Sequence, residues 1–318
     1  MRIAVVLPAY NEELCIEQVI LDFHRHLPEA LIHVVDNNSS DGTGSIARAV
    51  MASHSIAGSV MFVREQGKAN AVRRAFEEID ADLYVMADAD TTYAGSEART
   101  LIQPVAEGRA DMVVGDRHAA GVYREQNKRR FHDFGNNLVK NVINLLFRSE
   151  LHDVLSGYRV FSRRFVKNFP ILSKGFDLET EMSVHALSHR FSVLELPISY
   201  KDRPAGSFSK LNTFSDGILV MRKILGLFIA HSPLRFFNVF CALSALVSLA
   251  VGISPVLEYL ETGFVKKLPS LVAASGFLVL ALLFFAIGLL LEMSRQYQLT
   301  NYHHRVLNFT ALDRRRGD

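Results

Sequence analysis

The stretch Ala81-Asp82-Leu83-Tyr84-Val85-Met86-Ala87-Asp88-Ala89-Asp90 decides both the fold of this chain and the place of its site. Residues 81–87 are mostly apolar, which predicts a buried strand. Asp88 and Asp90 follow at the end of that strand. Buried carboxylates are costly unless a positive group meets them, and their oxygens suit Mg²⁺ or Mn²⁺ as ligands. The alternative interpretation is a pair of turn carboxylates that cap the next segment.

The composition excludes several classes of protein. The 318 residues carry a net charge of +2, so no global field predicts a nucleic-acid partner. Cys15 and Cys241 belong to no CxxC pattern, which leaves zinc and disulfide frameworks unsupported. The N-terminus opens on a strand-like run, without the pattern of a signal peptide. Apolar residues concentrate after residue 213, which divides the chain into a soluble-looking part and a membrane part.

Strand and helix patterns alternate along the first half of the chain. Apolar runs predict strands over 2–7, 31–35, 60–63, 81–87, 110–115 and 194–200. Helical patterns separate the first four runs, and another spans about 136–147. Pro197 predicts an edge position for the last strand, because proline cannot donate to a strand ladder. This order predicts an α/β fold with a parallel sheet and helices on both faces.

Polar side chains follow four of these strands. In open α/β sheets, ligands bind beyond the carboxyl ends of the strands. The polar groups are acidic, with Lys68 as a counter-charge, which suits a nucleoside whose phosphates are bridged by a metal ion. No G-x-G-x-x-G or G-x-x-x-x-G-K-[ST] occurs, which argues against Rossmann oxidoreductases and P-loop proteins. The four segments are Tyr10-Asn11-Glu12, 36–41, Gly67-Lys68 and 88–90.

Four motifs in this order resemble the family 2 glycosyltransferases with the GT-A fold, a doubly wound, Rossmann-like mixed sheet. The motifs are 6–13 (VLPAYNEE), 35–43 (VDNNSSDGT), 67–71 (GKANA) and Asp88-Ala89-Asp90. The resemblance implies a nucleotide site that includes Pro8, Tyr10, Glu12, Asp36, Asp41, Lys68 and Asp88. It implies a metal site at Asp88 and Asp90, with Asp90 catalytic and Mg²⁺ or Mn²⁺ as cofactor. Two residues depart from the pattern. Asn37 stands where many relatives have a second acid, and Thr92 stands where close relatives often have Gln.

Three further motifs resemble those of the polyprenyl-phosphate branch, which includes dolichyl-phosphate mannose synthase and bacterial undecaprenyl-phosphate glucosyltransferases. They are Gly115-Asp116-Arg117, 156–159 (SGYR) and 175–181 (GFDLETE). The chain has no Trp, so it lacks the Gln-X-X-Arg-Trp motif of processive polymerases. The resemblance implies a lipid-phosphate site at Arg117, Arg129, Arg130, Ser156 and Arg159. It also implies a loop that closes over the donor diphosphate with Arg203 and Lys210, which makes Arg117 and Arg203 catalytic.

The rest of the chain predicts attachment to a bilayer. Residues 213–232 predict an amphipathic interfacial helix, and the apolar runs 236–257 and 268–291 are long enough to span. The expected organisation is a GT-A domain over 1–212, the interfacial helix, a transmembrane hairpin over 233–292 and a basic tail over 293–318. Basic residues on both sides of the hairpin place the catalytic domain and the tail in the cytosol. We therefore expect a multi-pass protein of the cell inner membrane.

The sequence thus predicts an inverting transfer of one sugar from a UDP- or GDP-sugar to a polyprenyl phosphate. A phosphate monoester has a second pKa of about 6, so it needs no strong general base. A rival is transfer to a glycolipid hydroxyl, with Glu179 or Glu181 as base. A rival of another class is an inactive membrane scaffold that keeps the fold. The membrane helices also allow a homo-oligomer, as in relatives with paired helices.

Overall fold

The computed structural model describes residues 1–118, 130–171, 178–200, 225–226 and 229–317. The chain divides into two compact units. The first contains Met1–Ser215 and Arg305–Asp318, and the second contains Asp216–His304. The predicted loop with Arg203 and Lys210 lies outside the described residues, and so does most of the predicted interfacial helix over 213–232.

The first unit is built on a seven-stranded mixed sheet in the order β3-β2-β1-β4-β6-β5-β7. β1 to β4 run parallel to one another, and β5 runs parallel to β7. β6 pairs antiparallel with both β4 and β5, so β5 points the same way as β4. The strands are β1 (Ile3–Ala9), β2 (Leu31–Asp36), β3 (Gly58–Phe62), β4 (Leu83–Met86), β5 (Met112–Asp116), β6 (Arg159–Ser162) and β7 (Val193–Pro197).

The mixed sheet confirms the GT-A-type fold class and corrects the purely parallel pattern predicted from the strand order. β6 was not among the predicted strands, because its apolar run is only Val160 and Phe161, flanked by Arg159 and Ser162. The other strands were predicted at their positions, and β7 lies at the edge of the sheet as Pro197 indicated.

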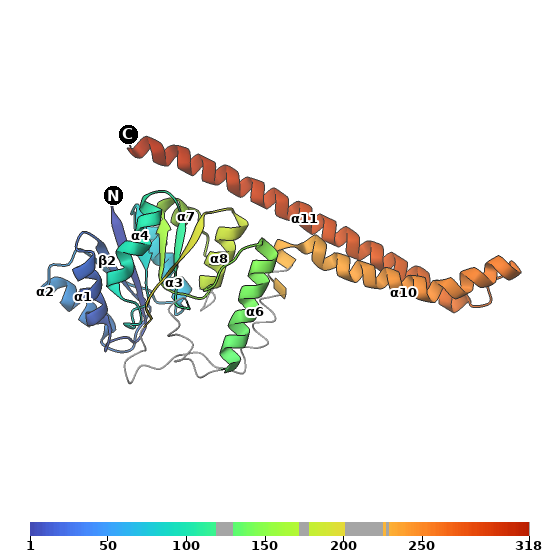
Figure 1. Ribbon diagram of the computed structural model, residues 1–318, viewed down its shortest axis with the longest axis horizontal. Helices are drawn as coiled ribbons and strands as arrows, with labels where there is room; N and C mark the ends of the chain where they lie inside the picture. The colour runs from blue at the N-terminus through green and yellow to red at the C-terminus, as the bar shows by residue number, and fades with distance from the viewer. Residues whose placement is uncertain (119–129, 172–177, 201–224, 227–228, 318) are drawn as a thin grey trace. The chain divides into compact units, whose positions relative to one another are not determined.

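Helices cover both faces of the sheet (Figure 1). On one face, α1 packs against α2 and α4, and Ile16, Ile20 and Leu101 join Val5 and Val85 in the main hydrophobic core. On the other face, α3 contacts α7, and Phe161 of β6 is stacked on the Phe165 ring and meets the Phe76 ring edge-on. The helices are α1 (Ile16–His26), α2 (Thr43–Ser53), α3 (Lys68–Glu78), α4 (Ala98–Ala106), α7 (Arg163–Asn168) and α8 (Leu178–Ser188), with a 3-10 turn η1 (Gly95–Glu97) before α4.

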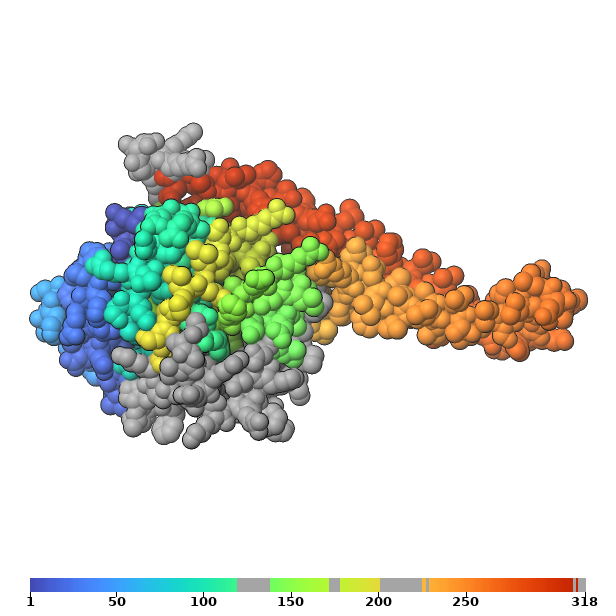
Figure 2. Space-filling view, in the orientation of Figure 1, coloured from blue at the N-terminus to red at the C-terminus, as the bar shows by residue number. Residues whose placement is uncertain are grey.

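One more helix of this unit, α6 (Arg130–Phe147), packs against α8. Its other side lies at the surface, where Figure 2 shows the C-terminal part of α6 in green. Leu145 on this helix is exposed, whereas Val139 and Ile143 are buried. This spacing of four residues is the pattern of an amphipathic helix, and it confirms the helix predicted near 136–147.

The alternation along β4 decides which helices meet the Asp88 carboxylate. Leu83 and Val85 lie in the core beneath α1 and α4. Tyr84, between them, points to the other face, where its ring meets Phe76 of α3 at 5.8 Å. Successive side chains of a strand alternate between faces. The same alternation, continued past Met86, directs Asp88 toward α3 and α8.

The second unit contains the helical hairpin of α10 (Pro233–Thr262) and the start of α11 (Leu268–Gly317). Both helices are long and apolar enough to cross a membrane, as predicted. α11 runs on to Gly317, so the predicted basic tail is helical to that residue. Small residues bring the two helices together, as is usual for membrane helices: Ser248 Oγ donates to the Ala274 carbonyl at 2.7 Å, and a Cβ on Gly252 would lie 3.1 Å from Ala274 Cβ.

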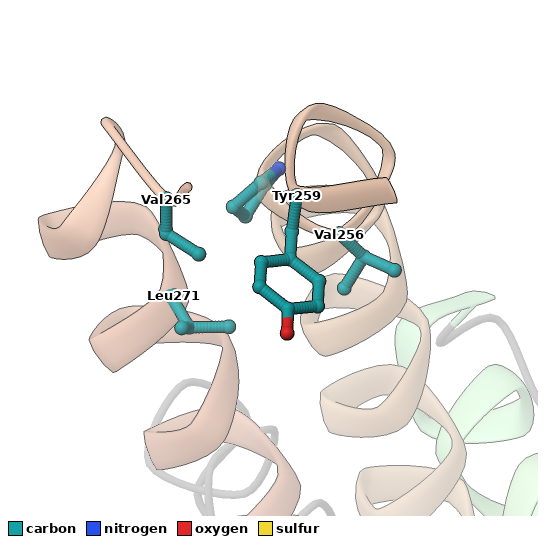
Figure 3. A pocket seen from close by; sticks show the side chains of 5 residues that line it. Val256, Tyr259, Val265 and Leu271 are labelled. Carbon is teal, nitrogen blue, oxygen red and sulfur yellow. The ribbon is translucent and has the colours of Figure 1, made fainter. Parts of the chain in front are cut away.

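An open pocket of about 260 Å³ lies at the turn of the hairpin (Figure 3). Its lining is apolar apart from the Tyr259 hydroxyl. No Asp, Glu, Lys, Arg, His or Cys side chain is among its lining residues, so it offers no charged group for a reaction. The lining residues are Pro255, Val256, Tyr259, Val265 and Leu271.

Candidate active site

The carboxyl ends of β1, β2, β4 and β5 lie along one edge of the sheet. That edge brings together most of the residues predicted for the site. Pro8 and Asp36 come from β1 and β2, which are neighbours, with Pro8 beside Val35 and Ala9 beside Asp36. Asp88 and Asp90 follow β4, and Arg117 follows β5. The segments are far apart in sequence, and parallel pairing is what assembles them.

The loops after β1 and β2 are joined by hydrogen bonds. Asn11 N donates to Ser39 Oγ at 3.1 Å, and Ser40 N donates to the Asn11 side chain at 2.8 Å. Glu12 N donates to Thr43 Oγ1 at 2.8 Å. Asn11 has φ 53°, a left-handed conformation that asparagine tolerates better than most residues. Because each loop satisfies the polar groups of the other, the wall that carries Glu12 is fixed before any ligand arrives.

The two predicted acidic contacts on this wall have different surroundings. Asp36 is buried, accepts from Ser39 N at 3.0 Å and abuts Gly44, where any side chain would collide with its carboxylate. Asp41 accepts from Thr43 N at 3.0 Å and from Glu13 N at 3.3 Å. Burial opposes the ionisation of Asp41, but its hydrogen bonds with Thr43 outweigh this and lower its pKa. The Asp41 carboxylate therefore fixes the start of α2.

Asn37 fixes the loop that leads to Lys68. Its side chain is buried, accepts from Gly67 N at 2.6 Å and donates to the Glu65 carbonyl at 2.7 Å. An aspartate has no donor for the second bond, which gives a physical reason for the amide at this position. Gly67 has φ 129°, a conformation that favours glycine. The adjacent Gln66 donates to the Tyr10 hydroxyl at 3.2 Å, so Tyr10 closes the same wall.

Lys68, which the sequence assigns to the nucleotide site, is paired with two carboxylates. Its amine contacts Asp88 Oδ1 and also lies 2.5 Å from Glu179 Oε1. Lys68 is the first residue of α3 and Glu179 the second of α8, the two elements that the alternation of β4 brings to Asp88. Burial opposes the charging of Lys68, but Asp88 and Glu179 outweigh it and raise its pKa. The amine is therefore charged at neutral pH, and it bridges two carboxylates from different elements.

Asp90 is held in a different way. It is 2% exposed, and its Oδ1 accepts from Thr92 Oγ1 at 2.5 Å and from Thr92 N at 3.2 Å. Thr91 between them has φ 63°, which turns the backbone immediately after Asp90. Thr92, considered from the sequence as a further metal ligand, here orients the Asp90 carboxylate.

The residues present fit a divalent cation. Among the described residues, no group of three or more His, Cys, Asp and Glu side chains is arranged to hold a metal. Mg²⁺ and Mn²⁺ do not require such a cage at nucleotide sites, because one or two carboxylates and the substrate phosphates complete the coordination. Asp88 and Asp90 provide two carboxylates at one strand end, and Asp90 is already oriented.

Gly157 forms the wall opposite Asp88. A Cβ at this position would lie 2.7 Å from Asp88 Oδ2 and 3.0 Å from Oδ1. The Gly157 backbone cannot easily retreat, because its N–H donates to the Tyr93 hydroxyl at 3.0 Å and Tyr93 is buried. Tyr158, the next residue, is anchored in turn by its hydroxyl to the Ala94 carbonyl at 3.1 Å. The glycine is thus required by the close approach of the backbone to a carboxylate.

We expect Gly157→Ala to lower the rate of sugar transfer by about 100-fold, because displacing a reacting group by about 1 Å has that effect. The backbone of Gly157 lies outside the left-handed region, so alanine is compatible with it and the melting temperature should change little. Gly276→Ala in α11, where the new methyl group meets nothing within 4 Å, is the matched control. Full activity of a folded Gly157→Ala protein would contradict this role.

Arg117, predicted to hold the lipid phosphate, lies at the end of β5 and is paired with Asp153. Its Nε and Nη2 donate to the two carboxylate oxygens at 2.7 and 2.8 Å, and its guanidinium lies 5.4 Å from the centre of the Tyr200 ring. Asp153 is 2% exposed. Burial opposes its ionisation, but the hydrogen bonds and charge of Arg117 outweigh this and lower its pKa. A phosphate that contacts Arg117 must therefore share the guanidinium with Asp153.

Two histidines stand beside this pair. His118 Nε2 lies 3.9 Å from Asp153, and His152 Nδ1 lies 3.5 Å from Glu195. Glu195 also accepts from His152 N at 2.7 Å and from Asp153 N at 2.9 Å, which positions the 152–153 loop. Neither histidine nor Glu195 was singled out from the sequence, because their proximity depends on β7 lying next to β5.

The structure separates Ser156 and Arg159 from the open part of the site. Both are fully buried. The Arg159 guanidinium donates to the Ser156 carbonyl at 2.8 Å, the Val154 carbonyl at 2.6 Å and Ser183 Oγ at 3.0 Å. These bonds fold the 153–157 loop back onto β6, and burial lowers the pKa of Arg159. The predicted phosphate contact of this pair therefore has no exposed surface in this structure, and the pair supports the loop that carries Gly157 and Asp153.

Arg129, Arg203 and Lys210 lie outside the described residues, and Arg130 is described only as the first residue of α6. The sequence motifs alone continue to assign them to the lipid phosphate and to the donor diphosphate.

The chain is similar in sequence to a known protein family and to several known proteins. The model of a protein family described as "Glycosyl transferase family 2" matches residues 4–169. Glycosyltransferase AglJ of Haloferax volcanii is 29% identical over 299 residues, which are 92% of this chain and 95% of that protein. The polyprenol monophosphomannose synthase of Mycolicibacterium smegmatis is 28% identical over 213 residues, 64% of this chain and 79% of that protein. The dolichyl-phosphate hexose transferase of Haloferax volcanii is 27% identical over 223 residues, 70% and 92% of the two chains.

Solved structures share the fold. The crystal structure of glucosyl-3-phosphoglycerate synthase from Mycobacterium tuberculosis, in complex with Mn²⁺ and UDP-glucose, aligns with a TM-score of 0.53. The alignment covers 72% of this chain and 78% of that one, at 20% sequence identity. At this identity the likeness establishes the architecture of the sheet and its helices.

Proposed function

Because the chain belongs to glycosyl transferase family 2, we propose that it transfers one sugar from a nucleoside diphosphate sugar to the phosphate of a polyprenyl lipid. It is a glycosyltransferase with candidate membrane helices, and a divalent cation is typical of its fold. Beyond the family, the proposal specifies the acceptor, which is a polyprenyl phosphate, and the class of donor, which is a nucleoside diphosphate sugar. It also adds the sidedness, with the catalytic unit on the cytosolic face of the inner membrane.

The observation that carries the choice of acceptor is the state of Glu179. A hydroxyl acceptor requires a general base, and the acidic pair in α8 is where such a base was expected. Glu179 is buried and its carboxylate lies 2.5 Å from the charged Lys68 amine. The Lys68 amine occupies Glu179 Oε1, so this oxygen is not open to an acceptor hydroxyl. A phosphate monoester is largely ionised near neutral pH and needs no base, so the occupied Glu179 favours a phosphate acceptor and leaves Glu181 as the candidate base for a glycolipid hydroxyl.

Two relatives support the same choice. Their printed names describe a polyprenol monophosphomannose synthase and a dolichyl-phosphate hexose transferase. A polyprenyl phosphate stays in the bilayer, whereas a nucleotide sugar stays in water. Candidate membrane spans in the same chain as the catalytic unit hold the enzyme where both are available.

In the proposed reaction, an oxygen of the lipid phosphate attacks the anomeric carbon in line. The new oxygen–carbon bond forms as the bond from that carbon to the nucleoside diphosphate breaks, and the anomeric configuration inverts. A cation held by Asp88 and Asp90 supplies Lewis-acid stabilisation of the departing diphosphate. Arg203 and Lys210 are proposed to contact the same diphosphate, and Arg117 to orient the acceptor phosphate. The wall formed by Glu12, Tyr10 and Asp36 holds the nucleoside.

The test is a transfer assay with the full chain in detergent micelles, undecaprenyl phosphate, Mn²⁺ or Mg²⁺ and radiolabelled UDP- and GDP-sugars. We expect label from one donor in the organic phase, and chelator should abolish it. Undecaprenol, which lacks the phosphate, is the control acceptor and should take up no label. Label on undecaprenol, or on a glycolipid but not on the phosphate, would overturn the acceptor. The donor that gives the label also identifies the sugar and the base.

A further inference from the structure

The bridge from Asp88 through Lys68 to Glu179 places a fixed positive charge at the proposed metal site. The side chains of Lys68 and Glu179 are only 12% and 7% exposed, and that of Asp88 is 28% exposed. Asn37 fixes the loop before Lys68, and Ser183 Oγ bonds the Glu179 carbonyl at 3.0 Å within α8. Lys68 and Glu179 are therefore held by separate helices, α3 and α8, and the four-carbon stem of the lysine is the most flexible part of the bridge.

The charges at this site balance in a simple way. Asp88, Asp90 and Glu179 contribute three negative charges, and Lys68 contributes one positive charge. The sum of −2 matches a divalent cation. The lysine nevertheless competes with the cation, since its amine contacts Asp88, the carboxylate that the cation needs. Two cations on one half-buried carboxylate repel each other, because a local dielectric below that of water weakens screening.

We propose that Glu179 is a positioning residue that takes the Lys68 amine away from Asp88 when the metal binds. Its carboxylate is already in contact with the amine, so Lys68 never loses its counter-ion during the exchange. Lys68 without that partner would be a buried unpaired charge, which is strongly unfavourable. Glu179 and Lys68 thereby set the affinity of the site for its cation. This inference rests on the proposed metal at Asp88 and Asp90.

A purely structural ion pair makes a different prediction. If Lys68 and Glu179 only stabilise the packing of α3 against α8, replacing them changes the melting temperature. The metal affinities of the variants then do not follow the charge of the site. If they set the charge of the site, affinity follows the charge. The net charge of the site is −3 in Lys68→Met and −1 in Glu179→Gln. In the double variant Lys68→Met/Glu179→Gln it is −2 again.

The experiment is a Mn²⁺ titration of the full chain in detergent without nucleotide, with free Mn²⁺ measured by electron paramagnetic resonance. We expect Glu179→Gln to weaken binding by about tenfold and Lys68→Met to tighten it by about tenfold. The double variant has the same formal charge at the site as the unaltered chain, so it should bind within a factor of about three of it. Lys68→Arg keeps the charge and should also bind as the unaltered chain does. Glu78→Gln, at the other end of α3 from Lys68 and with its side chain 43% exposed, is the matched control.

Each outcome decides between the hypotheses. The stated order of affinities, in proteins whose circular dichroism is unchanged, supports the exchange. Equal affinity of Glu179→Gln and the unaltered chain overturns it, and so does a double variant that binds tenfold more weakly. If Lys68→Met fails to fold, Glu179→Gln and the double variant still test the inference. Binding that Asp90→Asn leaves unchanged would instead remove the metal assignment itself, and the transfer assay reports separately on the acceptor.

Discussion

Replacing Asp90 by asparagine should lower the rate of sugar transfer by about 1,000-fold while the protein keeps its fold. Asparagine has nearly the same shape, and its carbonyl oxygen still accepts the bonds that Thr92 donates to Asp90 Oδ1. What disappears is the negative charge of a side chain that is 2% exposed. The loss therefore falls on cation binding and on stabilisation of the leaving diphosphate, with local packing preserved.

The measurement is the initial rate of label transfer at saturating donor and acceptor, together with the melting temperature by circular dichroism. Asp82→Asn is the matched control, because Asp82 lies just before the other end of β4, where it accepts from Arg2 N. It should keep full activity. A folded Asp90→Asn protein with undiminished activity would exclude Asp90 from the metal site and revive the interpretation of Asp88 and Asp90 as turn carboxylates.

The sequence was sufficient to predict the edge of the sheet where the site lies. Short apolar runs identify parallel strands that are covered on both faces, and polar residues at strand ends follow from the position of ligands in such sheets. Asp36, Asp88 and Asp90 were predicted this way, and the structure places them along the same edge. Two long apolar runs with few charges likewise predicted α10 and α11, because hydropathy depends on local composition alone.

Features that depend on tertiary pairing were not predicted. The contact of Lys68 with Glu179 joins residues 111 positions apart, and it exists because α3 and α8 cover the same face of β4. β6 lies between β4 and β5 in reverse orientation, and only that insertion brings Gly157 against Asp88. Short-range pattern carries no information about such an approach. Asn37 was noticed as a departure from relatives, but its two backbone bonds become visible only in the folded loop.

The motif arginines show how burial separates residues that look alike in sequence. Arg117 and Arg159 were both assigned to a lipid phosphate. Arg159 is fully buried and donates to backbone carbonyls, whereas Arg117 lies at the end of β5 with its side chain 11% exposed and paired with a carboxylate. Of these two, Arg117 is the one whose guanidinium has access to a ligand. The role of Arg117 toward a ligand can be separated from its contribution to stability, because its ion-pair partner Asp153 can be replaced together with it.

Arg117→Met should destabilise the catalytic unit by about 3–5 kcal/mol, because it leaves the buried Asp153 carboxylate without its partner. The double variant Arg117→Met/Asp153→Leu removes both charges and should recover most of that loss. Urea unfolding of the full chain in detergent, followed by circular dichroism, measures both. Arg99→Met, which breaks an ion pair with Glu29 between side chains that are 60% and 46% exposed, is the control and should cost less than about 1 kcal/mol.

The pH dependence gives an independent check on the same pair. The pKa of Asp153 is lowered in the folded protein, so its contribution to stability is present above the ordinary Asp value of about 3.9 and is lost as the pH falls through the lowered value. The unaltered chain should therefore lose stability below about pH 4 more steeply than the double variant. Equal slopes for the two proteins would show that Asp153 is not a stabilised carboxylate.

The double variant also isolates the catalytic role of Arg117, since it removes the guanidinium without leaving a buried charge. If Arg117 orients the acceptor, KM for undecaprenyl phosphate should rise by at least about tenfold, because a charge-assisted hydrogen bond to phosphate is lost. KM for the nucleotide sugar should stay the same, because the nucleoside wall is built from β1 and β2. A folded double variant with unchanged KM for both substrates would confine Arg117 to holding Asp153, and the acceptor phosphate would then have to be held by arginines outside the described residues.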